Sequence, residues 1–189
     1  MPAGNPRNVR VDPGWLYIAP LGSDEPDGYD GEWPEDWVPL GYTDQGPEFV
    51  MEQTFERVRV AEEIDPVATM QTERNTTVNL AAAEITARNL QVALNGGTIE
   101  VADGTVTFEP PAPGETTYLM VGWDATDGLE RWVFRRCVQT GNVTIPRRRA
   151  PDKAVIPMAF EVLLPERDEG EPVAPWKMWH AEDYTEAAS

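Results

Sequence analysis

The chain has 189 residues, a formal net charge of −18 at pH 7 and a pI near 4.3. This length suits one domain with a buried core, and the charge excludes a surface that attracts nucleic acid phosphates or an anionic membrane. The single cysteine, Cys137, excludes a disulfide within the chain, and no apolar run reaches bilayer length. Because the N-terminal residues lack the apolar core of a signal peptide, we expect a soluble protein made inside the cell.

The first half of the chain predicts strands separated by polar turns. Residues 1–12 are expected to form a flexible arm. Residues 21–34 are rich in Gly, Pro and Asp, which predicts a charged loop. The strands and extended segments predicted around this loop cover residues 14–20, 37–43, 49–64 and 67–80.

One short helix is predicted at residues 86–94. Thr86 can cap its start through the side-chain hydroxyl, and the Asn-Gly pair after the helix supplies the left-handed turn that ends it. Ala87, Leu90 and Leu94 recur at helical spacing, so we expect this face of the helix to pack on a sheet.

The second half predicts further strands and a tail. Asp103-Gly104 fits a type I′ turn and predicts a two-residue hairpin over residues 98–109. Pro157 places the last long strand at a sheet edge or a bulge. Residues 165–189 are predicted to form an acidic C-terminal arm with a mobile end, and the whole chain forms one domain. The other predicted strands are 116–123, 129–139 and 153–164.

Residues 40–97 carry four features in a characteristic order. They are an LG-T turn after a Trp-bearing strand, a charged extended loop, a strand carrying Thr and Asn, and a glycine-terminated A-x-E-x-T-x-x-N-L-x-x-A-L helix. This order resembles the major tail tube proteins of long-tailed, siphovirus-type bacteriophages. The resemblance covers the middle third of the chain well and extends more loosely to Leu164.

The resemblance implies a mainly β fold, a β-sandwich or barrel with one short flanking helix, an extended loop and terminal arms. It also implies six subunits in a ring, with rings stacked around a tape measure protein. The loop at 44–66 would reach adjacent rings or subunits. Tail tip and terminator proteins would lie at the two ends of the tube. The tube would assemble in the host cytoplasm and would conduct DNA on ejection without binding it specifically. The expected location is the virion tail, and no catalysis, cofactor or membrane is implied.

Charge is unevenly distributed along the chain. Residues 24–63 carry thirteen acids against Arg57 and Arg59, a net of −11, whereas residues 131–153 have a net charge of +6. These regions can pair within one chain or between neighbours in a ring, and the resemblance favours neighbours. Aromatic anchors often dominate interface energetics. The predicted subunit-interface residues are therefore Trp33, Trp37, Arg57, Arg59, Arg147, Arg148, Arg149 and Trp176.

A conduit for DNA should not bind DNA, and an acidic lumen repels phosphates and lets DNA slide. We therefore expect carboxylates of the charged middle segment to face the lumen. The predicted lumen-facing residues are Glu52, Glu56, Glu62 and Glu73.

Other chemistries find little support in the sequence. His180 and Cys137 are single residues of their kind, which argues against a catalytic triad and a zinc site. The acidic loop lacks the ligand spacing of a calcium loop, and no phosphate-binding glycine motif is present. Two alternatives to a tube subunit remain. One is a monomeric carbohydrate-binding β-sandwich of a virion that stacks sugars on Tyr29, Trp33 or Trp37, and the other is a related phage connector or head-decoration protein.

Overall fold

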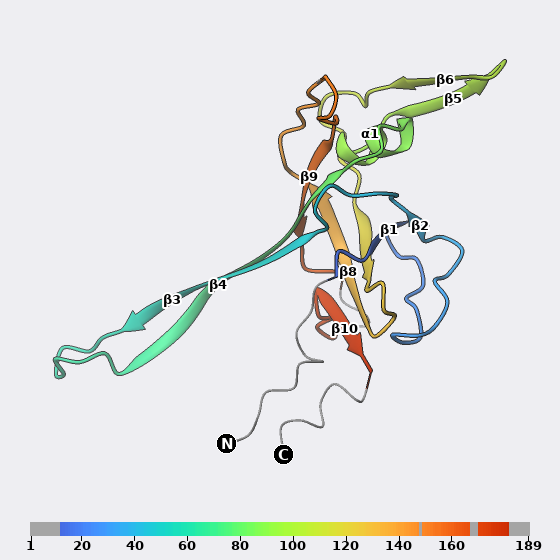
Figure 1. Cartoon of the computed structure of the whole chain (residues 1–189). Helices are drawn as coiled ribbons and strands as arrows, with labels where there is room; N and C mark the ends of the chain where they lie inside the picture. The colour runs from blue at the N-terminus through green and yellow to red at the C-terminus, as the bar shows by residue number, and fades with distance from the viewer. Residues whose placement is uncertain (1–11, 148, 167–169, 182–189) are drawn as a thin grey trace.

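The computed structural model describes residues 12–147, 149–166 and 170–181, and Figure 1 shows a mainly β molecule with two projecting hairpins. The predicted N-terminal arm, except Asp12, and the mobile end predicted for the C-terminal arm lie outside these residues. The expectation of a mainly β fold with one short helix is confirmed. The elements are β1 (Trp15–Pro20), β2 (Val38–Pro39), β3 (Glu48–Val58), β4 (Ala68–Ala82), α1 (Ala87–Ala93), β5 (Thr98–Ala102), β6 (Thr105–Glu109), β7 (Leu119–Asp124), β8 (Glu130–Gln139), β9 (Ile156–Val162) and β10 (Trp176–His180).

The described strands form an eight-stranded antiparallel sheet in the order β2-β1-β7-β8-β9-β4-β3, with β10 also paired to β8, and a separate β5–β6 hairpin. The chain after β2 links the two sides of this sheet. Leu40 donates its backbone N–H to Leu16 on the β1 side, and Thr43 forms a β-bridge with Ala82 of β4. The body of the sheet therefore partly closes on itself, as the predicted sandwich or barrel requires.

The centre of the sheet is buried on both faces. On one face, Val121, Phe134 and Phe160 join the main core, to which α1 contributes Val92 and Ala93. On the other face, a second cluster contains Ala19, Trp37, Met120 and Val133, with Trp33 packed against it. Trp33 and Trp37 come from the segment between β1 and β2, so the acidic loop predicted from the sequence covers one face of the sheet.

Helix α1 begins where the sequence predicts. The Thr86 hydroxyl accepts a hydrogen bond from the Asn89 backbone N–H at 3.1 Å. The expected packing face is confirmed only for Leu90, which packs partly buried against the main core, whereas the residues that α1 buries are Asn89, Val92 and Ala93. Asn89 is tolerated there because its amide donates to the carbonyls of Leu40 at 3.1 Å and Glu84 at 2.9 Å. Buried polar groups cost little when they find such partners.

The C-terminal region corrects two expectations. Residues 176–180, inside the predicted arm, form β10, which pairs with β8 from Trp176↔Phe134 to His180↔Glu130. The strand with Pro157 is not an edge strand, since β9 lies between β8 and β4. Proline is accommodated because β8 pairs with β9 only at residues 160–162, so Pro157 has a paired neighbour on the β4 side alone.

A glycine in β7 allows the second face to close. A Cβ on Gly122 would lie 2.4 Å from the Trp33 ring and 2.8 Å from the Trp37 ring. We expect Gly122→Ala to push both rings off the sheet and to lower the free energy of unfolding by about 1–3 kcal/mol. Denaturant unfolding and a red shift of tryptophan fluorescence would measure this. Gly28→Ala is the control, because the nearest atom to its Cβ is 3.5 Å away; equal losses in both variants would contradict the packing argument.

Candidate assembly surfaces

The β3–β4 hairpin extends away from the body of the molecule (Figure 1). β4 pairs with β9 only through residues 76–82, so beyond this point β3 and β4 pair only with each other. We call residues 51–75 the ribbon; every residue in it except Pro66 is exposed. A two-stranded hairpin without a covering layer is marginally stable in water. The ribbon nevertheless displays apolar side chains, including Phe55 (54% exposed), Ile64 (91%) and Met70 (60%).

The strand register separates the charges of this hairpin onto two faces. Successive residues of β3 alternate between faces, and cross-strand partners share one. Thr54 pairs with Glu73, while Gln53 pairs with Arg74. An irregularity after this point adds one residue to β4 and leaves the alternation of β3 intact. One face of the paired strands therefore carries Glu48, Glu52, Glu56 and Glu73, and the opposite face carries Arg57 and Arg74.

The tip of the ribbon is closed by hydrogen bonds that hold an apolar residue outward. Arg59 Nη1 donates to the carbonyl of Ile64 at 3.2 Å, and the Val67 N–H donates to the carbonyl of Val58 at 3.0 Å. Ile64 is 91% exposed and is flanked in the sequence by Glu63 and Asp65. Of the predicted lumen and interface residues, Glu62 and Arg59 thus belong to the tip. Glu52, Glu56 and Glu73 share the acidic face.

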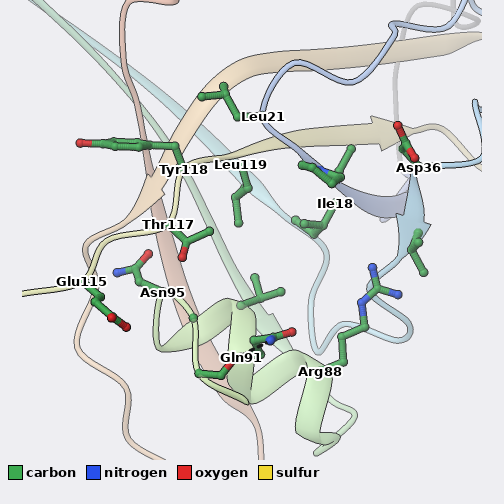
Figure 2. A pocket seen from close by; sticks show the side chains of 16 residues that line it. Ile18, Leu21, Asp36, Arg88, Gln91, Asn95, Glu115, Thr117, Tyr118 and Leu119 are labelled. Carbon is green, nitrogen blue, oxygen red and sulfur yellow. Dashed lines mark hydrogen bonds between the residues drawn. The ribbon is translucent and has the colours of Figure 1, made fainter. Parts of the chain in front are cut away.

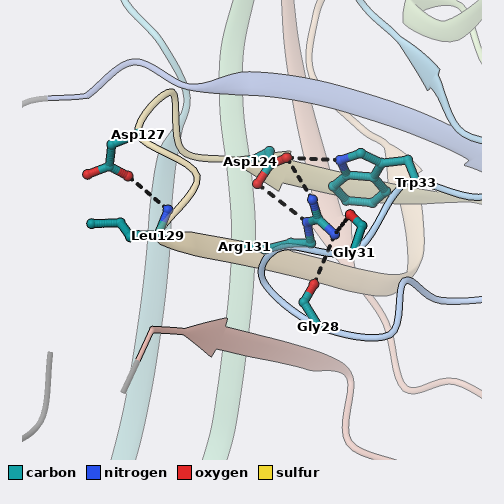
Figure 3. Close-up of polar contacts among 7 residues, drawn as sticks. All are labelled: Gly28, Gly31, Trp33, Asp124, Asp127, Leu129 and Arg131. Carbon is teal, nitrogen blue, oxygen red and sulfur yellow. Dashed lines mark hydrogen bonds and ion pairs between the residues drawn. The ribbon is translucent and has the colours of Figure 1, made fainter. Parts of the chain in front are cut away.

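Arg131 is the buried centre of a polar cluster that holds the acidic loop (Figure 3). Its guanidinium is paired with Asp124, with 2.9 Å between Nη2 and Oδ2, and Nη1 donates to the carbonyls of Gly28 at 2.9 Å and Gly31 at 2.7 Å. Asp124 also accepts from Trp33 Nε1 at 3.1 Å. Since Arg131 is only 3% exposed, this cation is committed within its own chain.

Two further members of the basic segment also pair in cis. Arg135 holds Glu25 of the acidic loop, with 3.1 Å between Nη2 and Oε2, and Lys153 lies 2.7 Å from Asp44. Pairing of the two regions within one chain, the less favoured alternative, therefore accounts for Arg135 and Lys153, while Arg131 pairs with Asp124 and reaches the acidic loop through backbone carbonyls.

The predicted interface arginines after β8 remain available. Arg147 and Arg149 are exposed, and in the described residues neither forms an ion pair. Arg148 lies outside the described residues.

The predicted interface tryptophans pack within the chain. Trp33 stacks on Tyr17 with 4.5 Å between ring centroids, and the Arg131 guanidinium lies 4.6 Å from its ring. Trp37 is 4% exposed. Trp176, half-buried in β10, lies 5.2 Å from the Trp132 ring. Rings engaged in this way offer little free face for stacking on a sugar, so the carbohydrate-binding alternative gains no support from Trp33 or Trp37.

The hollow between α1 and the ends of β1 and β7, of about 530 Å³, shows no catalytic constellation (Figure 2). Its lining mixes aliphatic side chains, for example Ile18, Leu21 and Leu119, with polar ones, and includes no histidine, cysteine or serine. Burial raises the pKa of the Cys137 thiol to about 12, which leaves it unreactive.

Among the described residues, no three metal-ligating side chains gather, and no helix is both long and apolar enough to cross a bilayer.

The comparison with protein families decides the identity. A family model described as phage tail tube protein matches residues 2–188. The chain belongs to the phage tail tube protein family. Such proteins are structural, non-enzymatic components of the virion tail, and they self-assemble into tubes. No curated protein matches the chain. The predicted resemblance to tail tube proteins is confirmed at the level of the family.

Sequence reasoning missed two residues that organise this tail tube protein. Arg131 was assigned only to a basic segment, and Asn89 only to a helix motif. Each donates to at least one carbonyl group that lies far away in the sequence, Arg131 to Gly28 and Gly31 and Asn89 to Leu40. No local sequence pattern predicts which backbone carbonyl will accept a hydrogen bond from a given side chain, so only the fold identifies these contacts.

The Arg131 cluster makes a stability prediction. Arg131→Met leaves the Asp124 carboxylate without its cation and removes the donor to two carbonyls. We expect a loss of about 3–5 kcal/mol in the free energy of unfolding, the usual effect of breaking a buried pair. The matched control is Arg135→Met, whose pair with Glu25 is partly exposed and should contribute about 1 kcal/mol or less. Urea unfolding compares the two variants, and a larger loss in Arg135→Met would be incompatible with this ranking.

Proposed function

We propose that this tail tube protein is the major tail tube subunit of a siphovirus-type phage. Six copies form a ring, and rings stack around a tape measure protein between the tail tip and the terminator. Assembly takes place in the host cytoplasm, and the finished tube conducts DNA on ejection without binding it specifically. The chain acts as one domain, with contacts added by its N-terminal arm and by the acidic C-terminal residues after β10. Family membership and the feature order of residues 40–97 support this proposal.

The ribbon is the observation that carries the proposal. Its two strands have no covering layer in the described chain, and they expose Phe55, Ile64 and Met70. β3 is also the last strand on its side of the sheet, so its outer edge pairs with no other strand among the described residues. Such an edge pairs readily with another strand. A neighbouring copy would cover Phe55, which lies on the face opposite the acidic one, and extend the sheet around the ring.

The separated charges of the β3–β4 hairpin suit a lining for DNA. The acidic face, with Glu52, Glu56 and Glu73, would point into the lumen together with Glu62 of the tip. Repeated in every subunit, these carboxylates create a negative potential that repels phosphates. The opposite face, with Arg57 and Arg74, would meet the acidic surface of a neighbour. One strand register would therefore provide both an acidic face for the lumen and a basic face for the subunit contact.

Electron microscopy of the negatively stained purified protein tests the proposal directly. We expect rings or tubes with a central channel. Featureless particles of monomer size at high concentration, with the other tail proteins added, would overturn it.

The exposed basic loop supplies a second test. Reversing Arg147, Arg148 and Arg149 to Glu should raise the protein concentration needed for tube formation at least about tenfold, because unlike charges at the subunit boundary become like charges. Circular dichroism should show an unchanged monomer, since Arg147 and Arg149 are exposed. Replacing all three by Lys keeps the charge and should preserve tubes. Normal tubes from the Glu variant would remove these residues from the interface.

The acidic face makes a third prediction. Glu52→Lys, Glu56→Lys and Glu73→Lys together should leave tubes that retain DNA inside, because the lumen then attracts phosphates. A labelled single-stranded oligonucleotide should become protected from nuclease at low salt and lose protection as salt rises. The control carries Glu32→Lys and Glu35→Lys in the exposed part of the loop before β2. Equal protection in both would show that the acidic face does not line the channel.

A further inference from the structure

A second exposed apolar surface includes Val101 and Val106 of the β5–β6 hairpin, and Figure 1 shows this hairpin at the far end of the molecule from the ribbon tip. This surface is built by α1 and the β5–β6 hairpin. The register pairs Ile99 with Phe108 and Val101 with Val106, so these four side chains share one face of the hairpin. The opposite face is polar, as the pair Glu100↔Thr107 shows. The hairpin is therefore amphipathic, with its apolar face directed to α1.

The groove between α1 and this hairpin has a volume of about 560 Å³ and is open to solvent. We call it the helix–hairpin groove; its lining is Ile85, Thr86, Ala87, Arg88, Leu90, Ile99, Val106 and Phe108. Ala87 and Leu90, which the sequence predicted to pack on a sheet, line this groove. Helix α1 has only seven residues and does not cover the hairpin, so Val101 stays 73% exposed and Val106 57% exposed.

An arginine without an ion pair among the described residues borders the groove. Arg88 is half-buried, and none of the ion pairs in the described ranges involves it. Burial lowers its pKa, and no carboxylate lines the groove. Arg88 also lines the adjoining hollow shown in Figure 2, together with Asp36 and Glu115, but none of the ion pairs of the described residues joins it to either carboxylate. A ligand that brings both an apolar side chain and a carboxylate would satisfy this site.

The ribbon tip of another copy has this chemistry. Ile64 is 91% exposed, and Glu63 and Asp65 flank it. From the body to the tip, the eight ribbon residues of β3 span roughly 26 Å at the usual rise of a strand. Figure 1 shows the ribbon tip on the opposite side of the body from α1 and the β5–β6 hairpin, the two elements that line the helix–hairpin groove. Unlike surfaces at opposite ends are the requirement for head-to-tail stacking of copies.

We propose that the helix–hairpin groove receives the ribbon tip of a second copy of this chain. Ile64 fills the apolar groove, and the carboxylates beside it neutralise Arg88. This inference rests on the proposed function, because it assigns two surfaces to the contact by which copies join into a tube. A second copy is the occupant because the chain displays both halves of the contact and its family self-assembles.

Disulfide cross-linking tests the contact in assembled tubes. The only natural cysteine, Cys137, is fully buried with a pKa of about 12, so it gives little background. The double variant Ile64→Cys/Val106→Cys should form ladders longer than dimers on a non-reducing gel, because each copy links to two others. Each single variant should give no ladder. A disulfide requires Cα atoms within about 7 Å, so a ladder reports direct contact.

The control pair is Ile64→Cys/Leu164→Cys, which uses a residue 60% exposed outside the groove. Tubes without a ladder, or an equal ladder in the control, would overturn the groove contact and leave the proposed function standing. Absence of tubes in the unmodified protein would overturn the proposed function and this contact with it.

A charge exchange keeps the test decisive if the cysteine variant fails to fold. Arg88→Glu should raise the concentration needed for tube formation about tenfold or more, with an unchanged circular dichroism spectrum. Adding Glu63→Lys and Asp65→Lys should restore assembly, because the charges are then exchanged across the contact. Failure of the second change to restore assembly, with the monomer folded, would contradict the pairing.

Discussion

The structure depends on covering both faces of the central strands β7 and β8. One face packs on the main core with α1, and the other needs the loop between β1 and β2. That loop is rich in carboxylates and has few aliphatic side chains. Its apolar contact with the sheet therefore comes from two tryptophans, and ion pairs hold it in place. Arg131 is the principal anchor, because it joins Asp124 on β7 to two carbonyls of the loop. The absence of a side chain at Gly122 makes room for the rings.

Ion pairs and aromatic contacts within the chain limit which surfaces are free to contact another copy. Arg131, Arg135 and Lys153 are engaged within the chain, and Trp33 and Trp37 are covered. The remaining features are the ribbon, the basic loop after β8 and the helix–hairpin groove. They lie in different parts of the molecule, as a heterologous interface requires. A net charge of −18 keeps free copies apart, so specific docking has to overcome a general repulsion.

In the β3–β4 hairpin, the alternation of side chains along a strand separates an acidic face from a basic one. A period of two places side chains alternately on each face of a strand. Glutamates at positions 48, 52 and 56 of β3 therefore fall on one face, and Arg57 falls on the other. The irregularity near Thr54 is absorbed by one extra residue in β4, so the two faces stay distinct along the hairpin.

Elements defined by neighbouring residues could be read from the sequence. The Asp103-Gly104 turn placed both strands of its hairpin correctly, and Thr86 marked the start of α1, because turns and caps depend on backbone groups a few residues away. Tertiary structure alone decided that residues 176–180 pair with β8, that Asn89 is buried, and that Arg131 serves the loop. Each of these depends on groups that folding brings together from distant parts of the chain, and local sequence patterns do not predict which distant groups will be in contact.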